Sequence, residues 1–253
     1  MGILKNRVAI ITGASSGVGK GCAEYFAEQG AIIVACARRL EKLEELSNEV
    51  SRKGGKMLPV RCDVGIEDDI AHVVETTIKE FGKVDILANI AQGDLDKPNY
   101  LVDTTYELAL DSFKTGAAAS MLFMQKCFPY MKEANYGRII NCASASALIG
   151  TPGFAAYEMA KGGVMALTRN AAKEWAQYGI VTNCFLPMIL TESFEKSEQG
   201  KAAAKKITEQ IPTRYFGKPY EDCGPIVAFM ASEEARYLNG QMIGVDGGFH
   251  LLA

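Results

Sequence analysis

Seven short apolar runs rich in β-branched residues recur along the chain and alternate with longer stretches of helical periodicity. This alternation is typical of a parallel sheet whose strands are joined by helices. The apolar runs are continuous, which indicates strands that are covered on both faces. We therefore predict an α/β fold with a doubly wound, seven-stranded parallel sheet flanked by helices, with strands at 8–11, 31–35, 57–62, 84–88, 138–142, 181–186 and 241–245 and helices at 17–29, 39–52, 67–81, 104–131, 155–178 and 220–231.

Two longer segments, 92–103 and 188–219, interrupt this rhythm. Long loops inside a compact α/β domain are usually functional lids or disordered segments. Residues 201–210 within the second segment have the composition of a short helix, so we interpret that segment as a hinged flap. We predict one domain spanning 1–253, with a substrate flap at about 188–219.

Composition excludes several classes of function. The 27 Lys and Arg against 30 Asp and Glu leave a net charge of -3, without the basic excess that binds nucleic acid or a membrane surface. Two histidines and seven cysteines without a C-x-x-C pair argue against a metal site. With no signal peptide or membrane-spanning stretch in the sequence, we expect a reduced cytoplasmic protein whose thiols are buried as small hydrophobic groups.

A glycine-rich turn follows the first predicted strand, from Thr12 to Gly19. It departs from the literal G-x-G-x-x-G fingerprint, but its three glycines allow a ligand to approach the backbone closely. The first amides of the following helix would then form an anion site suited to a phosphate. The alternative is a tight turn that needs glycine only for its positive φ angles.

Arg38 and Arg39 follow the second predicted strand. In dinucleotide-binding sheets an acid at this position favours NAD, whereas an arginine accommodates a 2′-phosphate. Two guanidinium groups and no carboxylate therefore predict NADP(H), with Arg38 bidentate to the phosphate and Arg39 stacked on adenine. The alternative is that both side chains only mark a helix start, where the helix dipole is unfavourable to them.

Four features, taken together with their order, resemble the short-chain dehydrogenase/reductase family over essentially the whole chain. They are the turn from Thr12 to Gly19, the sequence Cys62-Asp63-Val64, the Tyr157-x-x-x-Lys161 motif, and Ser144 thirteen positions before the tyrosine. The resemblance implies a Rossmann-type dinucleotide-binding domain, hydride transfer between a nicotinamide and an alcohol or ketone, and a homotetramer or homodimer. Small residues of the predicted helix from 155 (Ala156, Ala160, Gly163 and Ala166) would permit close packing of a second subunit, or packing within the chain.

Ser144, Tyr157 and Lys161 are the predicted catalytic residues. Tyr157 and Lys161, at i and i+4 on a helix, project from one face, so the ammonium stabilises an ionised phenol. Tyr157 would then act as general acid or base while Ser144 donates a hydrogen bond to the substrate oxygen. The alternative is an ordinary surface tyrosine and a loop serine. In the family Lys161 also binds the nicotinamide ribose.

The resemblance implies further cofactor contacts. Asp63 should accept a hydrogen bond from the adenine amino group, beside Val64, while residues after the fourth and sixth strands should line the nicotinamide half. Asn89 could instead cap a strand end, and Thr191 could start the flap helix. The predicted cofactor-binding set is Gly13, Ser15, Ser16, Gly17, Val18, Gly19, Arg38, Arg39, Asp63, Val64, Asn89, Ala91, Tyr157, Lys161, Pro187, Ile189 and Thr191.

The chain departs from the family pattern at three places. The N-N-A-G stretch reads Asn89-Ile90-Ala91-Gln92, and Met188 stands where glycine is common. The family's fourth catalytic residue, an asparagine, is replaced by Phe113, which cannot hydrogen-bond a relay water. The proton path to Tyr157 would have to be rebuilt through Ser112, Lys114 or a chain of solvent.

Apolar residues flank the predicted catalytic residues and the flap, which suits a bulky apolar ketone or alcohol of steroid-like or alicyclic shape. Each of these residues is explained equally well as core. A 3-oxoacyl thioester and a sugar ketone remain alternative substrates, and a nucleotide-sensing protein with weak catalysis is an alternative function. The candidate pocket residues are Leu148, Phe154, Met188, Phe194 and Phe216, with Gln92 as a polar group.

Overall fold

The computed structural model describes residues 2–93, 98–190 and 198–251. A single parallel sheet of seven strands forms its centre, in the order β3-β2-β1-β4-β5-β6-β7. The α/β fold and all seven predicted strands are confirmed, with ends that agree to within two residues. The strands are β1 (Val8–Thr12), β2 (Ile32–Ala37), β3 (Lys56–Arg61), β4 (Ile86–Asn89), β5 (Gly137–Cys142), β6 (Ile180–Pro187) and β7 (Met242–Val245).

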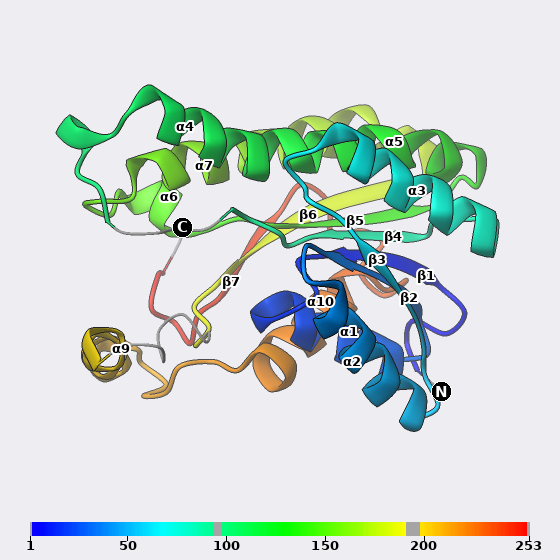
Figure 1. Ribbon diagram of the computed structural model, residues 1–253, viewed down its shortest axis with the longest axis horizontal. Helices are drawn as coiled ribbons and strands as arrows, with labels where there is room; N and C mark the ends of the chain where they lie inside the picture. Colours follow the sequence, from blue (N-terminus) through cyan, green and yellow to red (C-terminus); the bar gives the residue numbers. More distant parts are fainter. Residues whose placement is uncertain (1, 94–97, 191–197, 252–253) are drawn as a thin grey trace.

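Helices cover both faces of the sheet (Figure 1). One layer contains α3 (Glu67–Phe81), α4 (Tyr106–Phe113), α5 (Ala119–Glu133), α6 (Ser146–Ile149) and α7 (Ala155–Glu174). The other contains α1 (Gly17–Glu28), α2 (Leu40–Arg52) and α10 (Gly224–Met230). The predicted helix within the flap segment is confirmed as α9 (Glu198–Gln210).

Several local features depart from the predicted helices. The long helix expected at 104–131 contains a π-turn, η2 (Lys114–Ala118), between α4 and α5. A second π-turn, η4 (Pro219–Cys223), leads into α10, and the 3₁₀ turn η3 (Ala176–Tyr178) follows α7. α6 and the 3₁₀ turn η1 (Leu101–Asp103) are absent from the predicted elements, because such short turns carry too few residues for a periodic signal.

Burial follows position in the sheet. The strands β1, β4 and β5 are buried throughout, whereas β3 and β7 are only partly covered. The expectation that every strand is covered on both faces is therefore wrong for these two, because each lies at an open edge of the sheet. All seven cysteines are buried free thiols, as predicted. No helix in the described ranges is long and apolar enough to cross a membrane.

The topology determines where a ligand can bind. The connections reverse direction between the neighbouring strands β1 and β4, which creates the crevice used by doubly wound folds. All neighbouring strands pair in parallel, so their carboxyl ends meet at one edge of the sheet. The segments that follow the strands, which contain most of the predicted site residues, therefore converge there.

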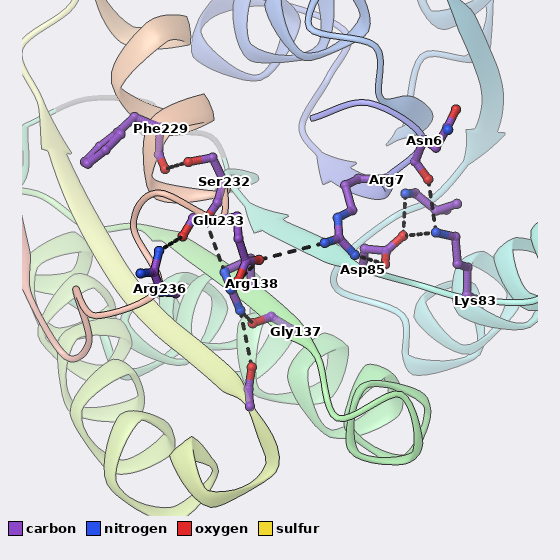
Figure 2. Close-up of polar contacts among 12 residues, drawn as sticks. Asn6, Arg7, Lys83, Asp85, Gly137, Arg138, Phe229, Ser232, Glu233 and Arg236 are labelled. Carbon is purple, nitrogen blue, oxygen red and sulfur yellow. Dashed lines mark hydrogen bonds and ion pairs between the residues drawn. The ribbon is translucent and has the colours of Figure 1, made fainter. Parts of the chain in front are cut away.

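A polar network closes the opposite, amino-terminal edge (Figure 2). Arg138 of β5 is 2% exposed and donates to the carbonyl oxygens of Gly137, Gly179 and Ser232 and to the Glu233 carboxylate. Beside it, Asp85 accepts from the backbone amide of Val8 and pairs with Arg7 and Lys83. This buried guanidinium satisfies acceptors from several elements and joins the start of β5 to the segment after α10.

Replacing Arg138 with methionine is expected to lower the free energy of unfolding by about 3 kcal/mol, because several buried acceptors lose their donor. Urea denaturation at a fixed protein concentration measures the change. Glu233→Gln is the matched control, since this side chain is 55% exposed and its ion pair should be worth less than about 1 kcal/mol. Equal losses of unfolding free energy for the two variants would show that the buried hydrogen bonds of Arg138 add no stability beyond its ion pair with Glu233.

Candidate active site

The glycine turn forms a close-packed junction between β1 and α1. Gly13 and Gly17 have φ angles of 70° and 53°, where side chains are strained. A Cβ on Gly19 would lie 2.3 Å from the Gly13 carbonyl oxygen, so only glycine lets the helix start this close to the turn. Ser16 is the N-cap of α1, but its hydroxyl does not cap the helix amides, and the first turn carries no acid. The helix start therefore fits the pyrophosphate of a dinucleotide.

Arg39 connects the end of β2 to this turn. Its Nη2 donates to Ser15 Oγ at 2.9 Å and to Ser16 Oγ at 2.8 Å, and both Arg38 and Arg39 are exposed. The structure thus brings the predicted phosphate-binding residues together at the carboxyl edge. It places Arg39 over the turn hydroxyls, a contact that the sequence analysis did not anticipate.

Asp63 and Ala91 lie on either side of the β1 end. Asp63 Oδ1 accepts the Gly65 amide at 2.9 Å in a tight turn after β3. Ala91 faces the glycine turn, because a Cβ on Gly13 would lie 3.0 Å from the Ala91 Cα. The amides of Ile90 and Ala91 both donate to Thr12 Oγ1 at 2.9 Å, which holds the segment after β4 against the turn.

Asn89, unlike the other residues predicted to bind the cofactor, has its side chain in a buried hydrogen-bond network. It is 4% exposed, and its Nδ2 donates to Asn141 Oδ1 at 2.9 Å. Asn141 in turn donates to Thr168 Oγ1 at 3.0 Å. These buried side chains join β4 and β5 to α7 beneath the site, and they hold the ends of the two strands at fixed positions.

The predicted catalytic residues converge at the carboxyl end of β5. Lys161 is 3% exposed, and its Nζ donates to the Cys142 carbonyl oxygen at 2.8 Å. The same Nζ lies 5.6 Å from the centroid of the Tyr157 ring, as expected for neighbours one helical turn apart on α7. A buried ammonium requires such polar partners, because burial without them is costly.

Ser144 and its neighbours complete this group. Ser144 Oγ lies 2.8 Å from Ser146 Oγ and accepts the Ser146 amide at 3.3 Å. Sequence reasoning missed Ser146, although a second hydroxyl two residues after Ser144 was the available signal. Burial raises the pKa of the adjacent Cys142 thiol to about 11, so this thiol stays protonated near neutral pH.

The segment after β6 pairs with the end of β7 and with the chain around Gly217. Met188 donates its amide to the Val245 carbonyl oxygen at 2.9 Å, and Leu190 donates to that of Gly217 at 3.0 Å. Ile189 and Gly217 form a β-bridge, which brings the two ends of the predicted flap together. Two predicted residues, Thr191 and Phe194, lie outside the described residues.

The structure also locates the departures from the family pattern. Phe113 is 47% exposed, and its Cε2 lies 3.5 Å from where a Cβ on Gly163 would be. Lys114 extends toward Gly65, beside the Asp63 turn. Gln92 instead packs against the junction of α4 and η2, where its Nε2 donates to the carbonyl oxygen of Ser112 in α4 at 3.3 Å.

Comparison with known proteins agrees with this geometry. A family model described as enoyl-(acyl carrier protein) reductase matches residues 13–250. A 12α-hydroxysteroid dehydrogenase of Clostridium sp. is 33% identical, with 98% of each chain covered. The 3-oxoacyl-(acyl-carrier-protein) reductase FabG of Thermotoga maritima is also 33% identical, covering 97% of this chain and 98% of its own. A solved structure from Sinorhizobium meliloti 1021, assigned as a short-chain alcohol dehydrogenase, has a TM-score of 0.91 at 30% identity and covers 97% of both chains.

The chain belongs to the short-chain dehydrogenase/reductase family. It is accordingly an oxidoreductase of the alcohol and ketone type that binds NAD(P)(H) and acts on small molecules.

Proposed function

We propose that this protein is an NADP(H)-dependent oxidoreductase that interconverts a secondary alcohol and a ketone, with Ser144, Tyr157 and Lys161 as its catalytic residues. One observation carries the proposal. Lys161 is buried, held on the Cys142 carbonyl oxygen, and lies one helical turn from Tyr157 at the same strand end as Ser144.

The nicotinamide, when bound, supplies or accepts the hydride. Ser144 then donates a hydrogen bond to the substrate oxygen, and its own orientation is set by Ser146. Tyr157 transfers its hydroxyl proton to that oxygen during reduction and takes it back during oxidation. The Lys161 ammonium places a positive charge beside the phenolate that remains after reduction.

The preference for NADP(H) follows from the end of β2. Arg38 and Arg39 are exposed beside the glycine turn, and the stretch from Cys36 to Arg39 offers no carboxylate to a ribose hydroxyl. Guanidinium groups bind phosphate through charge-assisted hydrogen bonds. The remaining contacts to the cofactor are assigned, as predicted, to Asp63, Val64, Asn89, Ala91, Pro187, Ile189 and Thr191.

A bulky apolar substrate is the class we favour. Leu148 is exposed on α6, Phe154 directly precedes α7, and Met188 follows β6 at the start of the segment 188–219, which we assign as the substrate flap of this single domain. The 33% identity to a hydroxysteroid dehydrogenase supports this class. The similar identity to FabG proteins supports the alternative, a 3-oxoacyl thioester.

Competition between two ketones tests the substrate class. We expect a bicyclic alicyclic ketone to have at least a tenfold higher kcat/KM than an acetoacetyl thioester, because apolar burial supplies about 0.8 kcal/mol per CH₂ group. Consumption of each ketone in one mixture, with NADPH in excess, gives the ratio directly. A ratio in favour of the thioester would assign the protein to the alternative class.

Exposed apolar side chains support a homodimer or homotetramer. Tyr106 and Leu110 on α4 and Met159 on α7 are 74%, 49% and 59% exposed. A second copy would cover this face. Small residues on α7 were expected to permit packing either of a second subunit or within the chain. Ala156 and Ala160 are buried within one subunit, so these two residues pack within the chain.

Phe113→Asn is expected to fold and to keep a kcat equal to or above that of wild type. The ring is half-exposed, so its loss opens no cavity, and an amide can hydrogen-bond water where phenyl cannot. Steady-state ketone reduction and thermal unfolding of the variant check both statements. A large fall in kcat with the fold intact would show that Phe113 itself supports catalysis.

A further inference from the structure

The loop between α6 and α7 joins the segments that carry two of the proposed catalytic residues. Ser144 lies two residues before α6, and Tyr157 lies in the first turn of α7. Glu158, the next residue on α7, reaches back to the loop, where its Oε1 accepts the Thr151 amide at 2.6 Å. The N-cap residue of α7, Phe154, makes no side-chain cap. Glu158 is therefore the side chain that holds this loop on the helix.

The same loop holds a second segment of the chain. The Asn99 amide donates to the Gly153 carbonyl oxygen at 2.8 Å. Gly153 has a φ angle of 90°, and a Cβ there would lie 2.9 Å from the Pro98 Cβ, so this close approach requires glycine. The Asn99 carbonyl oxygen accepts from Thr104 Oγ1 at 3.4 Å, which closes the turn that contains η1. The loop therefore connects Glu158 on one side to η1 on the other.

Exposed apolar side chains lie on both turns that flank this loop. They are Leu101 and Val102 on η1, the latter 90% exposed, and Leu148 and Ile149 on α6. η1 starts two residues after the donor of the backbone hydrogen bond that joins the two segments, and α6 ends four residues before its acceptor. The chain therefore keeps both turns within about 15 Å of that bond. Neighbouring exposed apolar groups of this kind mark a surface that a ligand or partner covers.

We propose, building on the proposed function, that Glu158 is a positioning residue for the ketone. By holding the loop it keeps η1 in place beside α6, and the two turns form apolar walls for the body of the substrate. The ketone oxygen lies at Ser144 and Tyr157, so the walls contact only parts of the substrate that do not react. Burial of apolar surface against them lowers the KM for ketones large enough to reach them.

Turnover itself does not depend on this loop. Ser144 is oriented by the Ser146 hydroxyl, and Lys161 is held on the Cys142 carbonyl oxygen. The effect of Glu158 is therefore on substrate binding, with kcat almost unchanged.

A simple helix cap is the alternative role for Glu158, because an acid in the first turn stabilises any helix. A cap contributes to stability and has the same effect on ketones of every size. A positioning residue has an effect that depends on the size of the ketone, and its loss also frees the segment that contains Asn99. These two differences separate the roles.

Hydrogen exchange of the whole protein, followed by mass spectrometry, tests the link between the two segments without any substrate. In Glu158→Leu, which has no acceptor, we expect the peptides that contain the Thr151 and Asn99 amides to exchange about tenfold faster than in wild type. Glu158→Gln keeps an oxygen acceptor and should preserve wild-type exchange in both peptides. Faster exchange at Thr151 alone would overturn the proposal, because η1 would then be held without the loop.

Kinetics with two ketones of one series test the effect on the substrate. Glu158→Leu should raise the KM for a bicyclic ketone about tenfold, while kcat and the KM values for a monocyclic ketone and for NADPH stay within about twofold of wild type. Glu158→Gln should match wild type. Glu174→Leu, the same substitution at an exposed site near the other end of α7, is the control. Equal KM increases for the two ketones would overturn the proposal and leave Glu158 as a helix cap.

Val102→Thr tests the wall on η1 directly. Threonine keeps the branched shape and adds a hydroxyl, and the side chain is exposed, so the fold is unaffected. The KM for the bicyclic ketone should rise about threefold. An unchanged KM would overturn the role of η1. Absence of any turnover by wild type would instead refute the proposed function, while the exchange experiment would still decide whether Glu158 holds the two segments together.

Discussion

Tyr157→Phe is expected to fold as wild type does and to lower kcat for ketone reduction about a thousandfold, within the range that a positioned general acid contributes. The substitution removes one hydroxyl and keeps the ring, which lies beside the Lys161 ammonium on α7. Affinity for NADPH should stay within about threefold, because the glycine turn and the arginines are untouched. Single-turnover kinetics and a fluorescence titration measure the two quantities separately.

Tyr178→Phe is the matched control for this variant. Tyr178 packs against Phe128 with ring centroids 5.7 Å apart, away from the carboxyl edge of the sheet. Its kcat should equal that of wild type. If Tyr157→Phe retains more than about a tenth of wild-type kcat, Tyr157 is not the general acid and another group must deliver the proton.

Replacing both Arg38 and Arg39 with alanine is expected to lower kcat/KM for NADPH about a hundredfold. Two charge-assisted hydrogen bonds to a phosphate are worth about 3 kcal/mol together, and 1.4 kcal/mol corresponds to a factor of ten. The kcat/KM for NADH should change less than about threefold, since NADH lacks the 2′-phosphate. Steady-state kinetics with each nucleotide give the ratio.

Arg52→Ala controls for the loss of positive charge in this region. Arg52 is exposed at the last turn of α2 and far along the helix from the β2 end. Arg52→Ala should have the same kcat/KM as wild type for both NADPH and NADH. Equal losses for NADPH and NADH in the double variant would show that the arginines support the turn, through the Arg39 contacts to Ser15 and Ser16, and do not read a 2′-phosphate.

The local hydrophobic pattern of the sequence was sufficient to predict the strands of the sheet. Parallel strands that are covered on both faces are mostly apolar, so β1 and β2 were visible as uninterrupted runs. Their order along the chain then placed the glycine turn, Ser144 and the segment around Ala91 at one edge. Helical spacing alone placed Tyr157 and Lys161 on one face of α7.

Contacts between distant residues could not be predicted in the same way. The Arg39 contact to Ser15 spans 24 positions, and the Lys161 contact to Cys142 spans 19 and uses a backbone carbonyl, which no side-chain pattern reveals. The packing of Gln92 on Ser112 depends on the π-turn η2, which has no signal in hydrophobic periodicity. The fold was therefore predictable from local sequence, while the polar partners of the site required the tertiary structure.

The most direct test follows reduced-nicotinamide absorbance with wild-type protein, a mixed panel of ketones, and either NADPH or NADH, with NADPH binding measured in parallel. The account predicts turnover of at least one ketone, with kcat/KM at least tenfold higher for NADPH than for NADH. Tight NADPH binding without turnover across the whole panel would contradict it and favour a nucleotide-sensing protein.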